Sequence, residues 1–253
     1  MSVSAKERIK VFWQPGCTSC LRTKEFLSKQ GIDFESINVM ESPEGMNQLR
    51  ALGARSVPVV ALGGRYTLCQ SFDDVTQFLG LTPTVQLLPP EELVRKLDVI
   101  LATAARLTGQ FTGQQAGAQF RDRPRTPGET AFHVFRVTEM GLQASRQIEL
   151  TFEGFDDRPP SEWTLDDITA WGARMREEVQ AWWRAEPDKS LSYQVPTYYG
   201  RRTMHDVLER TTWHAAQHTR QLALMLESHG TVPDTPLSRE TLAGLPVPDE
   251  VWG

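Results

Sequence analysis

A pair of cysteines separated by two residues, Cys17 and Cys20, constrains this chain more than any other feature of its sequence. The pair follows a short apolar run at 11–13 and a Pro-Gly turn, and a helical pattern begins directly behind it. Unpaired amide groups at the start of a helix stabilise a thiolate on the first cysteine. The second cysteine, one turn later, lies close enough to form a disulfide with it. A strand, a tight turn and a dithiol at the start of a helix are typical of a redox centre.

Zinc binding is the alternative interpretation of the same spacing. A cysteine pair that supplies half of the ligands of a zinc site needs a second pair of cysteines or histidines nearby. The chain has 3 cysteines, and the third, Cys69, stands alone. Cys69 fits a small buried residue, with a reactive sulfur beside the redox site as the alternative. So few cysteines build no disulfide framework, and we therefore expect a cytoplasmic protein in a reducing environment.

Composition excludes several classes of partner. A chain of 253 residues is long enough for one large domain or two ordinary ones. A net charge of -5 provides no basic footprint, so we expect no binding of nucleic acid. The sequence has no apolar run of membrane-spanning length, and residues 1–8 lack the apolar core of a signal peptide. We therefore expect no association with a membrane.

Residues 1–81 form the first predicted domain. The apolar and polar patterns predict strands at 8–13, 32–39, 56–62 and 65–68, and helices at 18–30, 42–52 and 71–80. Gly63-Gly64 is typical of a hairpin turn between the last two strands. Ser71 is the expected N-cap of the last helix. The predicted order is therefore β-α-β-α-β-β-α.

This order, together with four short motifs, resembles the glutaredoxin family of the thioredoxin fold over residues 8–81. The motifs are Cys17-Thr18-Ser19-Cys20, Ser56-Val57-Pro58, Gly63-Gly64 and Asp73-Asp74. The resemblance implies that Cys17 is the nucleophile and Cys20 the resolving thiol. It implies that Pro58 is cis and lies against the dithiol, with Val57 offering its backbone to a substrate. An ordinary trans proline at a strand start is the alternative for Pro58.

The resemblance also assigns a thiol-binding role to the acidic pair Asp73 and Asp74. Two departures from the family pattern argue against glutathione as that thiol. Glutathione-using members of the family usually have a basic residue shortly before the dithiol, where this chain has Trp13-Gln14-Pro15. They also have a Gly-Gly pair before the acidic residues, where this chain has 69–72, Cys-Gln-Ser-Phe. The reductant is therefore open between another low-molecular-weight thiol and a flavoprotein disulfide reductase.

The second half of the chain has a different character. A short proline-rich linker at 82–90 is followed by long segments with a period of 3.6 residues. Helices are predicted at 91–111, 127–150, 164–186 and 203–230, with capping signals at Thr126, Thr164 and Thr203. Helices of this length and number predict an all-α four-helix bundle over 91–230. The proline-rich tail at 231–253 is expected to follow the surface or to be loosely ordered.

Three of the histidines fall on helix faces that point inward. His214 and His218 are spaced i and i+4 on the last helix, so both imidazoles project from one face. His133 lies on an apolar stripe of the second helix of the bundle. Three imidazoles from facing helices make a metal site with positions open for water or substrate. By spacing alone, an ordinary buried pair explains His214 and His218 as well as metal binding does.

The bundle also resembles the DinB-like (YfiT-like) superfamily of four-helix metalloproteins over residues 91–229. The resemblance rests on Ala131-Phe132-His133, on the helix around His214 and His218, and on the aromatic loop at 196–200. It implies a divalent metal ion, Zn, Ni, Fe or Mn, held by the three histidines. Members of this superfamily include thiol-dependent S-transferases and an isomerase.

Two hypotheses of function follow. In the first, the chain is a bifunctional enzyme that exchanges disulfides at Cys17 and Cys20 and performs metal-assisted thiol transfer or isomerisation in the bundle. A low-molecular-weight thiol is then its reductant or co-substrate, and a small thiol or disulfide its substrate. In the second, the chain is a plain dithiol reductase. Its bundle then binds a ligand, docks the reductant or forms a homodimer.

Overall fold

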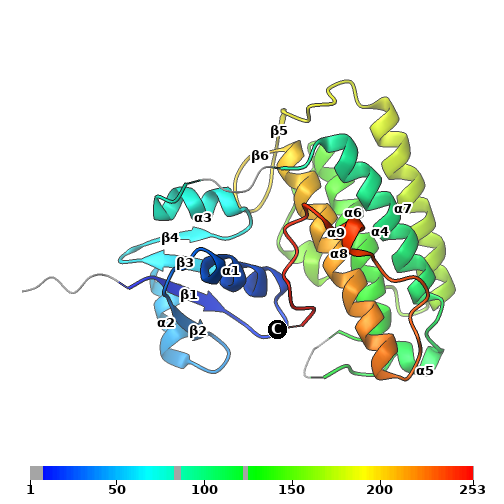
Figure 1. Ribbon diagram of the computed structural model, residues 1–253, viewed down its shortest axis with the longest axis horizontal. Coiled ribbons are helices and arrows are strands. Elements are labelled where there is room, and N and C mark those ends of the chain that lie inside the picture. The colour runs from blue at the N-terminus through cyan, green and yellow to red at the C-terminus, as the bar shows by residue number, and fades with distance from the viewer. Residues whose placement is uncertain (1–7, 83–86, 122–124, 253) are drawn as a thin grey trace, which may run out of the picture. The chain divides into compact units, whose positions relative to one another are not determined.

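The computed structural model describes residues 8–82, 87–121 and 125–252 (Figure 1). These residues divide into two compact units. One comprises the described residues of Met1–Gln86 and Pro248–Gly253, and the other comprises those of Leu87–Val247. The predicted linker at 82–90 falls partly on residues 83–86, which lie outside the described residues. The predicted tail is shared between the two units.

The first unit is built on a mixed sheet of short strands, β1 (Lys10–Trp13), β2 (Glu35–Asn38), β3 (Val59–Leu62) and β4 (Arg65–Leu68). Their order across the sheet is β2-β1-β3-β4. Strands β1 and β2 are parallel, and the other neighbouring pairs are antiparallel. This is the thioredoxin-like α/β arrangement that the sequence predicts.

Helices cover both faces of the sheet because side chains alternate along each strand. They are α1 (Thr18–Lys29), α2 (Pro43–Ala51) and α3 (Phe72–Leu79). Val11 points to one face, where it belongs to a buried cluster with Leu27 of α1 and Val75 of α3. Phe12 points to the other face and packs in a cluster with Leu49 of α2. The central strand β1 is therefore buried from both sides, which fixes the position of the segment that leaves it toward Cys17.

The second unit is a bundle of α4 (Pro90–Thr108), α6 (Pro127–Ser145), α7 (Leu165–Ala185) and α8 (Met204–Ser228). Thr126, Thr164 and Thr203 each form the predicted capping box at the start of a helix. Helix α8 packs against both α4 and α6. The all-α four-helix bundle is thus confirmed. Within the part of the chain that the structure describes, no helix combines the length and the apolar character needed to cross a membrane.

Several short elements have no counterpart in the sequence prediction. They are α5 (Gly113–Ala116), the 3-10 turn η1 (Glu153–Asp156), the strands β5 (Gln194–Val195) and β6 (Arg202–Thr203), and α9 (Arg239–Leu242). The helix predicted to reach residue 150 ends at Ser145 instead. The chain turns at Gln147, which has a φ of 64°, and Leu150 forms a β-bridge with Thr197.

The C-terminal stretch is more ordered than the sequence predicts. Its helix α9 lies against α4, where the ammonium group of buried Lys96 donates hydrogen bonds of 3.0 Å to the carbonyls of Glu240 and Thr241. Cationic donors at the carbonyl end of a helix satisfy its orphan acceptors. Further along, the amides of Asp249 and Glu250 donate to the carboxylate of Glu25 on α1.

Gly172, in the middle of α7, is buried against the ring of Phe135 from α6. A Cβ atom at this position would overlap the ring, which is itself fully buried. We therefore expect Gly172→Ala to destabilise the bundle by about 1–3 kcal/mol, because overpacking outweighs the gain in helix propensity. Thermal unfolding followed by circular dichroism measures the loss. Gly109→Ala is the control, since its Cβ would meet only ordinary contacts, and an equal loss there would contradict the explanation.

Candidate redox and metal centres

The dithiol lies at the amino end of α1, as predicted. Cys17 is the N-cap residue of this helix, and its Sγ accepts a hydrogen bond of 3.2 Å from the amide of Cys20. The two cysteines form a disulfide in the structure. Cys17 is half-buried, whereas Cys20 is fully buried. A substrate disulfide can therefore reach Cys17 from solvent, and the Cys20 amide that donates to the Cys17 sulfur also stabilises its thiolate.

The peptide bond between Val57 and Pro58 is cis, as the family resemblance implies. Strand β3 follows directly, and its first residue, Val59, pairs with Phe12 of β1. The antiparallel register therefore brings Pro58 alongside the end of β1 from which the chain continues to Cys17. The side chain of Val57 is half-buried against the cluster that contains Phe12.

The acidic pair occupies the first turn of α3. Ser71 caps this helix by accepting a hydrogen bond of 3.1 Å from the amide of Asp73. Asp73 is exposed and Asp74 is half-buried. Both carboxylates lie where the helix dipole favours negative charge, which gives them a structural role independent of any thiol.

Two buried residues near this turn were not assigned a binding role by the sequence. The guanidinium of Arg22 donates a hydrogen bond of 3.0 Å to the carbonyl of Gln70 and lies 4.1 Å from the ring centre of Phe72. It thereby ties α1 to the start of α3. Cys69 is fully buried, and this burial raises the pKa of its thiol to about 12. Cys69 is therefore protonated at neutral pH, in keeping with a small buried residue.

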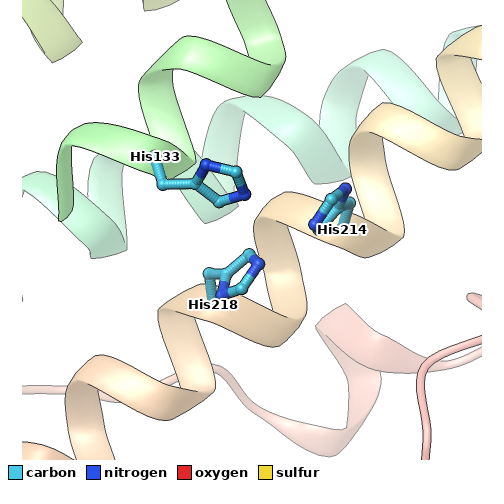
Figure 2. A group of neighbouring side chains, drawn as sticks. All are labelled: His133, His214 and His218. Carbon is cyan, nitrogen blue, oxygen red and sulfur yellow. The ribbon is translucent and has the colours of Figure 1, made fainter. Parts of the chain in front are cut away.

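The three predicted histidines converge in the bundle, as Figure 2 shows. His133 comes from α6, and His214 and His218 come from successive turns of α8. One ring nitrogen from each lies within 4.8 Å of the others. Their exposed fractions are 2%, 7% and 1%, respectively. Among the described residues, this is the group of potential ligands that the fold gathers closely enough for one ion.

The chemistry of this donor set fits a divalent ion. Three imidazoles this close and this deeply buried cannot all carry a positive charge, so neutral rings with available lone pairs are favoured. Nδ1 of His218 lies 2.8 Å from Oε1 of Gln221, an acceptor. With the proton on Nδ1, this contact leaves the lone pair on Nε2, the arrangement that supporting hydrogen bonds give to histidine ligands. Three nitrogen ligands leave further coordination positions open.

Aromatic side chains and one arginine border the histidine cluster. The ring of Phe155, in turn η1, stacks on His214 with 5.6 Å between centroids. Tyr198 lies 6.2 Å from Phe155, and the guanidinium of Arg210 lies 4.5 Å from the same ring. The guanidinium of Arg125 donates a hydrogen bond to the carbonyl of Phe155, which fixes the turn. Phe155 and Arg210 were missed in the sequence because nothing in the local pattern links a short turn to α8.

Comparison with known protein families separates the chain into the same two halves. A family model described as Glutaredoxin matches residues 9–67. A second model, described as DinB superfamily, matches residues 82–222, which is more than half of the chain.

Curated relatives match the first half. The glutaredoxin-like protein NrdH of Escherichia coli (strain K12) is 43% identical over 56 residues, which cover 22% of this chain and 69% of that protein. An uncharacterized glutaredoxin-like 8.6 kDa protein in the rubredoxin operon of Clostridium pasteurianum is 37% identical over 57 residues, covering 22% of this chain and 76% of that protein.

Two solved structures each match part of the chain. A DinB-like protein from Bacillus subtilis is 11% identical and covers 58% of this chain and 99% of its own, with a TM-score of 0.46. A mutant of a thioredoxin-like protein is 26% identical and covers 30% of this chain and 97% of its own, with a TM-score of 0.29.

Proposed function

Because the chain belongs to the DinB superfamily and carries a glutaredoxin-family domain at its amino end, we propose that it couples two kinds of thiol chemistry. The first is thiol–disulfide exchange at Cys17 and Cys20. The second is a metal-dependent thiol transfer or isomerisation at the three histidines. The observation that carries the proposal is that one chain holds a disulfide at a helix amino end and a buried trio of imidazoles.

The redox reaction follows from the positions of the two sulfurs. The Cys17 thiolate attacks one sulfur of a substrate disulfide, a mixed disulfide forms, and the released thiolate takes up a proton. The Cys20 thiol then loses its proton and attacks Cys17, which releases the second substrate thiol and closes the Cys17–Cys20 disulfide. Two electrons pass from the dithiol to the substrate. A flavoprotein disulfide reductase or a low-molecular-weight thiol must then reduce the Cys17–Cys20 disulfide back to the dithiol.

We expect Cys20→Ser to trap the physiological partner, because the mixed disulfide on Cys17 can no longer be resolved. Incubating the reduced variant with oxidised cell extract and analysing the intact protein by mass spectrometry identifies the bound thiol. The double variant Cys17→Ser/Cys20→Ser is the control and should carry no adduct. An absence of any adduct on Cys20→Ser would overturn the redox assignment.

In the bundle, His133, His214 and His218 are the residues that would hold a divalent ion. Such an ion supplies Lewis acidity, which lowers the pKa of a bound thiol and so presents a thiolate to an electrophile. The protein's own part is to keep the imidazoles neutral and oriented. All three rings are buried, and the contact of 2.8 Å between Gln221 and Nδ1 orients the ring of His218.

The second candidate function, a plain dithiol reductase with a non-catalytic bundle, is separated from the first by metal analysis. Purified protein that contains no stoichiometric metal and gains none on reconstitution would favour it.

We place the reaction in the cytoplasm, since a reactive dithiol with one further buried thiol suits a reducing compartment.

A further inference from the structure

The first unit contains a cavity of about 520 Å³ on the face of the sheet that α2 covers. Its floor is apolar and includes Phe12 of β1 and Ala61 of β3, both of them buried. Leu52, at the end of α2, adds a further apolar wall. Gly63 and Gly64 line it from the exposed β3–β4 hairpin without side chains, which leaves the cavity open to solvent. Sites for small molecules have volumes of about 300–1,000 Å³ and mostly apolar walls, so this cavity is large enough for one.

Two cationic side chains line this cavity because of the alternation along the strand. Lys10 and Phe12 are two residues apart on β1, so their side chains lie on the same face of the sheet. Arg8 continues the alternation, and it also lines the cavity. Among the described residues that line the cavity, none is acidic. The lining therefore presents positive charge beside an apolar floor.

The ammonium group of Lys10 is held in place and keeps the capacity to bind a ligand. It donates a hydrogen bond of 2.7 Å to Oε1 of Gln48 on α2, and its contact with the carboxylate of Glu35 is long, at 4.0 Å. An ammonium group has three N–H donors, so at least one is left for a ligand. Within the part of the chain that the structure describes, the guanidinium of Arg8 has neither a hydrogen bond nor an ion pair. Both groups can therefore contact an anion.

The end of α2, which borders the cavity, offers little opposition to an anion. The last carbonyls of a helix carry partial negative charge where they have no partner. Here the carbonyls of residues 48–50 each accept a hydrogen bond from an amide at 52–54. The negative end of the helix is therefore largely satisfied by its own chain.

An apolar floor beside two cations suits a molecule that is apolar at one end and negatively charged at the other. Apolar atoms gain from leaving water, and a partly desolvated cation attracts an anion more strongly than one in bulk water. We infer that this cavity binds an organic anion, with its apolar body on the floor and its anionic group at Lys10 and Arg8. A carboxylate and a phosphate share this chemistry. The site is separate from the dithiol, because Lys10 begins β1 and the chain leaves for Cys17 from the other end of that strand, roughly 10 Å away.

The test compares 2-naphthoate with 2-naphthamide, which has nearly the same shape and no charge. Each is titrated into the full-length chain, and the backbone amides are followed by NMR. We expect chemical shifts to change at Ala51, Gly63 and Gly64, and naphthoate to bind at least fivefold more tightly than naphthamide. A third probe, 2-naphthyl phosphate, distinguishes the two anionic groups. Tighter binding than naphthoate assigns a phosphate to the ligand, and weaker binding assigns a carboxylate.

Substitutions at the two cations test the recognition of charge. Lys10→Met removes the ammonium group and keeps the apolar stem, and Arg8→Gln removes the guanidinium. Each should lower the preference for naphthoate over naphthamide, and the double variant should abolish it. Arg50→Gln is the matched control, because Arg50 is an exposed arginine on α2 that does not line the cavity. It should keep the full preference.

A further variant tests the cavity itself. Ala51 is exposed and lines the cavity, so Ala51→Phe fills part of the space and should weaken the binding of both naphthoate and naphthamide. The double variant Cys17→Ser/Cys20→Ser should bind naphthoate as the wild type does. The inference is overturned if naphthoate does not bind or binds no more tightly than naphthamide. It is also overturned if the preference survives loss of both cations, if Ala51→Phe binds both probes normally, or if loss of the dithiol abolishes binding.

Discussion

Replacing Cys17 by serine is expected to lower the rate of disulfide reduction by more than about a thousandfold, as removal of an enzyme's nucleophile does. A serine hydroxyl stays protonated at neutral pH and attacks disulfides poorly, whereas the Cys17 sulfur accepts a hydrogen bond from the helix start. The rate is measured in a single turnover by mixing prereduced protein with a chromogenic aromatic disulfide. The released aromatic thiolate is followed by its absorbance.

Two controls separate this result from a general loss of structure. Cys20→Ser should release the first aromatic thiol at nearly the normal rate and then stop at the mixed disulfide. Cys69→Ala should show full activity, because the Cys69 thiol is fully buried and its pKa of about 12 keeps it protonated. A Cys17→Ser chain that still reacts at a comparable rate, or a Cys69→Ala chain that loses activity, would contradict the assignment of Cys17 as nucleophile.

The redox half of the chain was predictable because its signals are local. The apolar run before Cys17, the Gly63-Gly64 turn and the capping residue Ser71 each specify structure within a few residues. The cis bond at Pro58 came from the family resemblance and is confirmed. Arg22 could not be assigned its role, because its partner Gln70 lies 48 residues away and no periodic pattern links them.

The bundle was predictable in its helices but not in its ends or its surroundings. Periodicity predicted α4, periodicity together with capping predicted α6, α7 and α8, and the i, i+4 spacing placed His214 beside His218. The position of His133 opposite these two residues depends on how α6 packs on α8. The apolar stripe of α6 indicated that His133 points inward, but sequence spacing could not show that it meets the other two histidines. Phe155 reaches the site from a short turn after the chain reverses at Gln147. Tertiary packing alone determines such contacts.

Removing one imidazole is expected to abolish metal binding by the bundle. Purified wild-type protein should contain about one divalent ion per chain, and His214→Ala should contain almost none, since two nitrogens from different helices hold an ion weakly. Metal content is measured by inductively coupled plasma mass spectrometry after dialysis. His229→Ala is the matched control, because His229 is exposed at the end of the same helix and should leave the metal content unchanged.

Metal binding should also stabilise the bundle, which gives a second measurement that does not depend on activity. An ion present at about a thousand times its dissociation constant contributes about 4 kcal/mol to the free energy of unfolding. For a unit of this size, that corresponds to a rise in Tm of roughly 8–16 °C. We expect this rise when metal is added back to the apo-protein, and no rise for His214→Ala. A His214→Ala chain with the same metal content and the same metal-dependent Tm as the wild type would contradict a site formed by His133, His214 and His218.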